Sequence, residues 1–314
     1  MKHQVKKYID GVFEIIELNN NHISSKIAVN IGNTLFSLVV ENQEIVYFPF
    51  SLNEYKDNIK LAGNPFMHPW ANRLEDEYIH IENKAHFFPN SQKHVLYRDG
   101  NNLPLHGLLL KSNQWKTIEI YEDEQSCFHV AEFVFDDADF LSIFPFKHKI
   151  QIKHCLQNKA LSIKTTVTNL DKKTMPISFG FHPYFLKMDE NNILKIPSDN
   201  VIEVDEKMIP TGTNFNKNNK WNFNNDEIPL KENAFDDGFQ QLKYDNNVAA
   251  FELNNIKILF DKNYPFAQIY APKHETKPYV CIEPMTAATN ALNKSSCKMI
   301  SENTSFTAKF SIIA

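Results

Sequence analysis

Glycine is scarce in this sequence. There are eight glycines in 314 residues, and the two nearest to each other, Gly100 and Gly107, are seven positions apart. The motifs GxGxxG, GxxxxGK[ST] and GxSxG therefore cannot be written anywhere in the chain, which excludes the usual signatures of dinucleotide-binding proteins, P-loop proteins and α/β-hydrolases. The HExxH motif is also missing. Any chemistry must come from side chains scattered along the sequence.

Clustered positive charge and long apolar runs are missing too. The formal net charge is −5, arginine occurs only at positions 73 and 98, and the lysines are scattered. Binding to phosphate backbones needs a basic face, so we expect no nucleic-acid partner. No apolar run approaches the roughly 18–20 residues of a membrane helix. The basic residues 2–7 precede a segment too short and polar for a signal-peptide core. We therefore expect a cytoplasmic protein without a membrane partner.

Cysteine usage points away from a crosslinked or zinc-stabilised fold. The four cysteines, Cys127, Cys155, Cys281 and Cys297, never have CxxC spacing. A disulfide framework or a zinc ribbon is therefore not expected, and the sequence predicts four buried free thiols.

Apolar and polar residues alternate with period two along most of the chain, which is typical of half-buried β-strands. We predict strands at residues 12–18, 27–31, 34–40, 44–48, 115–121, 127–135, 149–156, 161–168, 247–253, 256–260, 279–283 and 306–313. Twenty-five phenylalanines and eleven tyrosines suit broad sheet-on-sheet packing. The prediction is an all-β fold, a large antiparallel β-sandwich with few short helices.

Three local features interrupt the strand pattern. Ser51 and Glu54 fit a capping box, so a short helix is predicted within residues 51–59. Residues 213–226 are polar and rich in asparagine and are predicted to form a solvated surface loop, and residues 236–239 read as a turn. Strand patterns of one character continue on both sides of the long loop. We therefore expect a single domain over residues 1–314.

Four segments combine polar residues with glycine or proline: 63–74, 102–107, 178–185 and 281–293. Binding groups concentrate on such segments when a rigid scaffold holds them. Arg73 offers a planar five-donor fork for bidentate hydrogen bonding, and a structural ion pair is its alternative role. Glu283 ends an apolar run, where a carboxylate is paired, functional or partly exposed at a strand end.

Histidine is plentiful, and most of the twelve must be bystanders. We expect His106 at a turn into a strand, and His182, which precedes a proline, in extended backbone. His68, His106 and His182 could ligate a metal together, but their spacing does not favour this over separate structural roles. No metal site is predicted.

Taken in order, these segments resemble the motifs of the aldose 1-epimerase (galactose mutarotase) family. The motifs are Asn72-Arg73, Leu105-His106-Gly107 followed by Trp115, His182-Pro183-Tyr184-Phe185, Asp236 with Phe239, and Glu283 with Asn290. The resemblance spans residues from about 60 to 293. It implies the family's large β-sandwich (supersandwich), in agreement with the strand pattern.

The resemblance also implies an activity: interconversion of the α and β anomers of a free aldohexose by acid/base ring opening, without a cofactor. His182 would be the general acid and Glu283 the general base, placed on opposite sides of the C1–O5 bond, with the histidine protonated and the carboxylate ionised. The sugar would be held by Arg73, His106, Asp236, Asn72 and Tyr184. Trp70 and Tyr184 could instead cover a sugar face or pack in the core.

Three departures from the family pattern concern the sugar rather than the acid and base. Leu108 stands where members often have a second glycine, and Gly180 stands where many galactose mutarotases have asparagine. The sequence of residues 283–286 also differs from the usual galactose-mutarotase sequence. The sequence is therefore interpreted as an outlying branch. Two alternatives remain: a hexose-6-phosphate 1-epimerase, whose phosphate pocket Arg73, Arg98 or lysines would have to form, and a non-catalytic carbohydrate-binding protein on the same fold.

Overall fold

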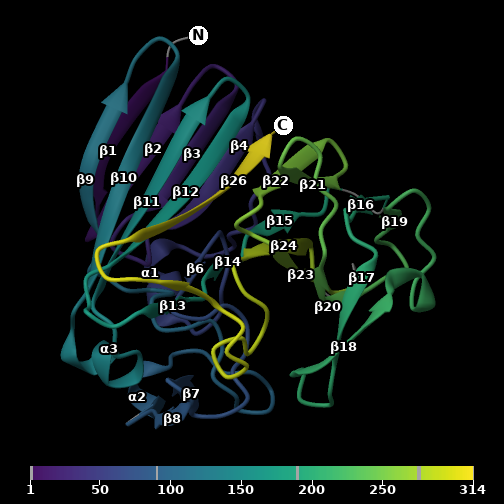
Figure 1. The fold of residues 1–314 in the computed structure, drawn as a ribbon. Coiled ribbons are helices and arrows are strands. Elements are labelled where there is room, and N and C mark those ends of the chain that lie inside the picture. The colour runs from purple at the N-terminus through teal and green to yellow at the C-terminus, as the bar shows by residue number, and fades with distance from the viewer. Residues whose placement is uncertain (1–2, 90, 189–190, 274–276, 314) are drawn as a thin grey trace.

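The computed structural model describes residues 3–89, 91–188, 191–273 and 277–313, and strands make up most of it (Figure 1). In this part of the chain, three large sheets of antiparallel strands surround a continuous apolar core, and the helices are few and short. The structure thus confirms the predicted large antiparallel β-sandwich.

The widest sheet has one continuous buried face. Its nine strands, in spatial order, are β19 (Glu227–Pro229), β16 (Ile193–Lys195), β21 (Val248–Leu253), β22 (Ile256–Asp261), β26 (Ser305–Ile313), β12 (Ala160–Asn169), β11 (His148–Gln157), β10 (Ser126–Phe135) and β9 (Lys116–Glu122). Along β11, buried and partly exposed residues alternate almost without interruption. This is the period-two signal that makes the long strands visible in the sequence.

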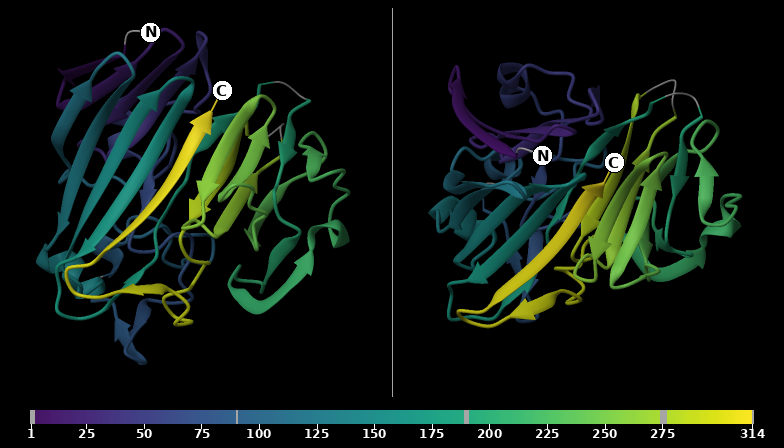
Figure 2. Two further views of the ribbon diagram at one scale, coloured as in Figure 1. Left: turned by 45° about the horizontal axis from the view of Figure 1, so that its top comes forward. Right: turned by 90° about the horizontal axis from the view of Figure 1, so that it is seen from above.

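The two other large sheets pack against that buried face. The first contains β1 (Gln4–Asp10), β2 (Phe13–Asn19), β3 (Ile23–Ala28), β4 (Thr34–Val40) and β5 (Gln43–Glu44). The second contains β18 (Pro210–Asn216), β17 (Asn200–Val204), β20 (Phe235–Gln240), β23 (Phe266–Ala271), β24 (Tyr279–Met285), β14 (Gly180–Phe181) and β6 (Phe66–Met67), and β15 (Tyr184–Leu186) also pairs with β24. Figure 2 shows the first sheet, in purple, stacked across the teal half of the widest sheet.

Aromatic rings fill the layer between the second sheet and the widest one. The rings of Phe181 and Phe310 lie 5.1 Å apart, and those of Phe179 and Phe306 lie 6.0 Å apart. All four side chains are buried. Burying each ring contributes about 1.5–3 kcal/mol, so this layer anchors the strands that flank residues 179–182.

Small elements complete the fold. Two small two-stranded sheets pair β7 (Tyr78–Ile81) with β8 (Lys84–Phe87) and β13 (Met175–Ile177) with β25 (Lys298–Ile300). The helix α1 (Leu52–Asp57) has Ser51 as its N-cap and a complete capping box with Glu54, as predicted. The helices α2 (Ser91–His94), α3 (Ala138–Ile143) and η1 (Lys217–Asn219) were not predicted. Among the described residues, no helix is long and apolar enough to cross a membrane.

Two strand predictions were wrong in position. The strand expected at 27–31 is β3, which ends at Ala28, and the one expected at 44–48 pairs with β4 at Gln43–Glu44 and then bridges β15 at Val46. The Glu44 carboxylate explains the second difference, because its Oε1 atom accepts hydrogen bonds from the backbone N–H groups of Leu38 and Val46, at 2.8 and 3.0 Å. The backbone beyond Glu44 then turns to β15, where Tyr47 N–H donates to the Tyr184 carbonyl at 2.8 Å.

Of two loop predictions, the one for 213–226 was correct in part, since most of this segment is exposed, and the one for 236–239 was wrong. The segment 213–226 begins inside β18, and its Lys217 is buried, with Nζ 2.5 Å from Asp226 Oδ1. Residues 236–239 lie in β20, because cross-strand pairing with β23 overrides the turn propensity of an Asp-Asp-Gly sequence. The four cysteines are free, but only Cys127 and Cys281 are buried, whereas Cys155 and Cys297 are partly exposed.

Candidate active site

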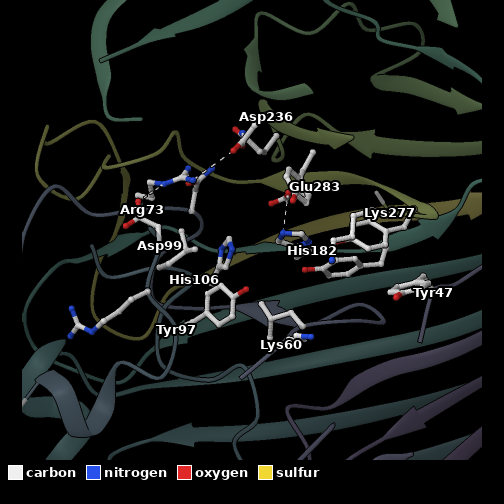
Figure 3. Close-up of a pocket in the computed structure, with 18 of the residues that line it drawn as sticks. Tyr47, Lys60, Arg73, Tyr97, Asp99, His106, His182, Asp236, Lys277 and Glu283 are labelled. Atoms are coloured by element: carbon white, nitrogen blue, oxygen red, sulfur yellow. Dashed lines mark hydrogen bonds and ion pairs between the residues drawn. The ribbon is translucent and has the colours of Figure 1, made fainter. Parts of the chain in front are cut away.

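An open pocket of about 550 Å³ lies over one face of the second sheet. The register of three strands places its floor. Glu283 on β24 is opposite Gln268 on β23, and Asp236 on β20 is opposite Tyr270 on β23. These four side chains line the pocket, and so does Tyr279 at the start of β24. Figure 3 shows Asp236 and Glu283 at its upper side and His182 below them.

His182 lies at the junction of β14 and β15 and reaches the floor from there. Its backbone N–H donates to the Pro65 carbonyl at 3.0 Å, and its ring stacks on Tyr184 with centroids 4.5 Å apart. Its Nε2 atom lies 3.3 Å from Glu283 Oε1. The proposed acid and base are therefore neighbours, side by side rather than on opposite sides of a sugar-sized gap.

Burial sets the protonation of this pair. It lowers the pKa of His182 to about 3. It also raises the pKa of Glu283 well above its usual value, with the Asp236 charge adding to the rise and Arg73 opposing it. In the free site the mobile proton is therefore held by the carboxyl group, contrary to the sequence-based expectation of an imidazolium and a carboxylate. The two forms differ only in the position of one proton along the 3.3 Å contact.

Arg73 is fixed by hydrogen bonds on two of its edges. Its Nε donates to Asp99 Oδ2 at 2.9 Å and its Nη1 donates to Asn72 Oδ1 at 2.9 Å. Its Nη2 lies 3.7 Å from Asp236 Oδ2, beyond hydrogen-bond distance. Asp236 in turn accepts a 2.8 Å hydrogen bond from Gln268. The arrangement leaves the Nη2 edge of the guanidinium facing the pocket (Figure 3).

His106 is held next to His182 by an unusual backbone. It lies between isolated bridges rather than at the start of a strand, with a positive φ of 63°. Its N–H donates to the Asn72 carbonyl at 2.9 Å, and its ring meets that of His182 edge-on at 5.0 Å. Burial lowers the pKa of His106 well below its usual value, with His182 and Arg73 adding to the effect. The neighbouring Gly107 has φ 75°, and a Cβ atom there would lie 2.2 Å from the His68 carbonyl oxygen.

All seven residues predicted from the sequence to form the site line this one pocket. They are Asn72, Arg73, His106, His182, Tyr184, Asp236 and Glu283. Glu283 is only 1% exposed, which excludes the alternative that it is a partly exposed carboxylate at the end of a strand. The roles of these residues in catalysis and binding stay predictions.

Further pocket residues were missed by the sequence reasoning. They include Tyr47, Lys60, Tyr97, Asp99, Gln268, Tyr270, Lys277 and Tyr279. One signal could have found Tyr279: it precedes Glu283 by four positions, so both side chains lie on the same face of a strand. Asp99 gave no such signal, because only the folded loop brings it to Arg73.

Three other residues named in the sequence analysis lie in the core. Trp70 and Trp115 are buried, and Trp70 stacks on Phe88. His68 pairs with His148 rather than with His106, with the two Nε2 atoms 2.7 Å apart. In the described part of the chain, no three His, Cys, Asp or Glu side chains are placed to hold a metal ion.

The chain is similar to proteins of one family over nearly its whole length. The model of the Aldose 1-epimerase family matches residues 14–300. Among solved structures, a galactose mutarotase-like protein from Clostridium acetobutylicum is 22% identical with a TM-score of 0.85, and the match covers 99% of this chain and 98% of that one. Galactose 1-epimerase from Lactobacillus acidophilus NCFM is 17% identical with a TM-score of 0.79, over 99% and 98% of the chains.

A GalM/aldose epimerase homologue from C. elegans is 16% identical with a TM-score of 0.75, over 96% of this chain and 98% of that one. At these identities the solved structures show a shared fold, the galactose mutarotase-like sandwich. The family match, by contrast, rests on the sequence itself and spans most of it. The chain belongs to the aldose 1-epimerase family.

Proposed function

We propose that this protein is an aldose 1-epimerase that interconverts the α and β anomers of a free aldohexose by acid/base ring opening. The observation that carries the proposal is the buried contact of 3.3 Å between His182 Nε2 and Glu283 Oε1 on the floor of the pocket. Family membership supports an isomerase of this type. The pair, the pocket and the surrounding hydrogen-bond donors supply what the reaction needs.

Ring opening moves two protons, one from O1 and one to O5, and both of these oxygen atoms are bonded to C1. The base removes the proton of the C1 hydroxyl, the C1–O1 double bond forms, the C1–O5 bond breaks, and O5 takes its electron pair and a proton from the acid. Both oxygens are bonded to C1, so the acid and the base must be close together. A separation of 3.3 Å between His182 and Glu283 suits this requirement.

The two groups exchange roles within one turnover. The active form differs from the free site by transfer of the mobile proton from Glu283 to His182 along their 3.3 Å contact; His182 then protonates O5, while the ionised Glu283 accepts the O1 proton. The open aldehyde then rotates about its C1–C2 bond and closes from the other face. On closure Glu283 returns a proton to O1 and His182 removes one from O5, which restores the starting protonation of the pair.

The remaining pocket residues fit the task of holding the sugar. Arg73 presents its Nη2 edge, which lies 3.7 Å from Asp236, and Asp236 and Asn72 present oxygen and nitrogen atoms that can pair with hydroxyl groups. His106 lies edge-on to His182. Tyr184 stacks on His182 and is nearly buried, so it supports the imidazole rather than covering a sugar face.

Polarimetry of freshly dissolved α-D-glucose and α-D-galactose tests the proposal. The protein should accelerate mutarotation, and His182→Ala or Glu283→Gln should each reduce the gain by about 10²–10⁴-fold. Glu252→Gln is the matched control, because it removes a carboxylate on β21 that pairs with Lys195 away from the pocket. Unchanged mutarotation with every aldose tried would contradict catalysis. Sugar binding by calorimetry without anomerisation would then identify a non-catalytic carbohydrate-binding protein.

A second candidate substrate is a hexose 6-phosphate. The pocket is also lined by Lys60, Arg98 and Lys277, and these basic side chains suit a substrate with an anionic group. Anomer-resolved proton NMR of glucose and glucose 6-phosphate separates the two. Higher kcat/KM for the phosphate would select the hexose-6-phosphate epimerase.

A further inference from the structure

Asp99 is a buried carboxylate that connects two parts of the site. Its side chain is 5% exposed. One oxygen, Oδ2, accepts the hydrogen bond from Arg73 Nε at 2.9 Å. The other, Oδ1, accepts the backbone N–H groups of Asn101 and Leu103, both at 2.9 Å. Asp99 therefore closes a tight turn through Oδ1 and holds the Arg73 guanidinium through Oδ2.

The contact with Asp99 controls the orientation of the Arg73 fork. A guanidinium is planar, so fixing its Nε–H and one terminal nitrogen fixes the direction of the other terminal nitrogen. Asp99 and Asn72 fix the first two, and Nη2 remains directed at the pocket beside Asp236. Without the Nε contact, the long side chain could rotate away from this position.

The turn that Asp99 closes also leads to His106. Leu105 N–H donates to the Tyr97 carbonyl at 3.0 Å, and Leu105 forms an antiparallel bridge with Arg73. The bridge and the Asp99 ion pair thus connect the same two segments, residues 72–74 and 97–106. Figure 3 shows Asp99 beneath Arg73, on the side away from Asp236.

We propose that Asp99 is a positioning residue for the epimerase reaction, which holds the Arg73 guanidinium so that Nη2 meets the sugar. The inference rests on the proposed function. Asp99 itself has no place in proton transfer, since its two oxygens are occupied by Arg73 and by the backbone of its own turn.

The variant Asp99→Asn isolates this role. Its amide oxygen can still accept the N–H groups of residues 101 and 103, which preserves the turn. Its NH₂ group then faces Arg73 Nε–H, so two donors oppose each other. Glu77→Gln is the matched control: it weakens the ion pair of Arg98, which flanks the same loop, without touching Arg73.

The first readout is structural and needs no activity. Because the chain has only two arginines, ¹⁵N-arginine labelling gives two Nε–H signals, which Arg73→Lys and Arg98→Lys identify. The Arg73 signal should be protected from exchange with water in the wild type and in Glu77→Gln, and should lose that protection in Asp99→Asn. An unchanged Arg73 signal in Asp99→Asn overturns the assignment.

The second readout is kinetic. Asp99→Asn should lower kcat/KM about ten- to a hundredfold, the loss expected for a hydrogen bond between charged groups. In an Arg73→Met background the same change should cost less than about twofold, because the two residues act as one unit. Equal losses in both backgrounds, or a loss as large in Glu77→Gln, would overturn the inference. If the wild type accelerates no sugar, the proposed function fails, and the NMR result alone decides the role of Asp99.

Discussion

The buried histidines make the stability of this fold strongly dependent on pH. Burial lowers the pKa of six of them: His68, His106, His129, His148, His154 and His182. Each is neutral in the native state, whereas in the unfolded chain it takes up a proton below about pH 6.5. Above that pH these groups do not change the free energy of unfolding. Below it, each one lowers the free energy of unfolding by about 1.4 kcal/mol per pH unit until its folded pKa is reached.

His154 provides the cleanest case. It lies in the middle of β11, is 1% exposed, and its ring stacks on His129 at 6.2 Å. Burial lowers its pKa to about 3, with His129 adding to the effect. Between about pH 6.5 and pH 4.5 this single side chain should therefore remove about 3 kcal/mol of stability, out of a total that is typically about 5–15 kcal/mol.

Urea-induced unfolding at several pH values between about 7 and 4.5 measures this effect. His154→Leu should reduce the slope of the free energy of unfolding against pH by about 1.4 kcal/mol per unit. Ile152→Val, a buried substitution two positions away on the same face, should lower stability by about 0.5–1.5 kcal/mol at every pH and leave the slope unchanged. An unchanged slope in His154→Leu would refute the reasoning.

Three further predictions concern Glu283 and Gly107 in or beside the site and Lys217 outside it. Because burial raises the pKa of Glu283, its carboxyl group should keep its proton to a higher pH than an exposed glutamate does, so infrared spectra recorded as the pH rises should contain a carboxylic-acid band that outlasts those of exposed glutamates and that Glu283→Gln removes. A spectrum without such a band would contradict the protonation described for the free pair. Gly107→Ala should destabilise the protein by well over about 1 kcal/mol in urea, since its Cβ would meet the His68 carbonyl, whereas Gly11→Ala, also at positive φ but in open space, should cost only about 1 kcal/mol. Lys217→Met should leave Asp199 and Asp226 with Lys243 as their remaining cation, and thermal unfolding should show a lower Tm.

The sequence predicts the long strands well because each has one buried face. Strands β10, β11, β12, β22 and β26 all lie within one residue of their predicted bounds. The short strands of the second sheet were largely missed because they lack this regular alternation: β23 has three consecutive buried residues, and β14 and β6 are only two residues long. Strand β24 is the exception, because its continuous apolar run predicts a strand from residue 279 although every residue in it is buried. Periodicity alone cannot report strands that are buried on both faces or consist of a single pairing.

The candidate site could be predicted in its members but not in its geometry. Glycine, proline and polar punctuation identify His106, His182 and Arg73 as loop residues, and the family resemblance adds Asp236 and Glu283. Neither the residue pattern nor the family resemblance reveals how deeply His182 and Glu283 are buried, because burial is a property of the assembled sheets. That burial reverses the protonation expected for the two residues. The single-domain organisation and the cytoplasmic location also stay predictions.

Sheet pairing explains how His182 and Glu283, about one hundred positions apart in the sequence, meet with such a short contact. Strand β24 carries Glu283, its neighbour β14 ends one residue before His182, and β6, the next strand, leads to Arg73. Gly180 on β14 is paired with both Met285 and Met67, so it lies at the centre of this three-strand unit. A Cβ atom at Gly180 would be 2.6 Å from the Pro284 carbonyl oxygen.

The close approach of β14 to β24 therefore requires a residue without a side chain at position 180. This accounts for a glycine where many galactose mutarotases have asparagine: the position sets the distance between two strands here. Hydrogen bonds between Phe179 and Thr286, at 2.9 Å from each backbone N–H, hold the strands on the other side of Gly180. The separation of His182 and Glu283 is thus determined by backbone packing behind the pocket. A different sugar preference can then arise from the pocket rim without any change in the proposed acid and base.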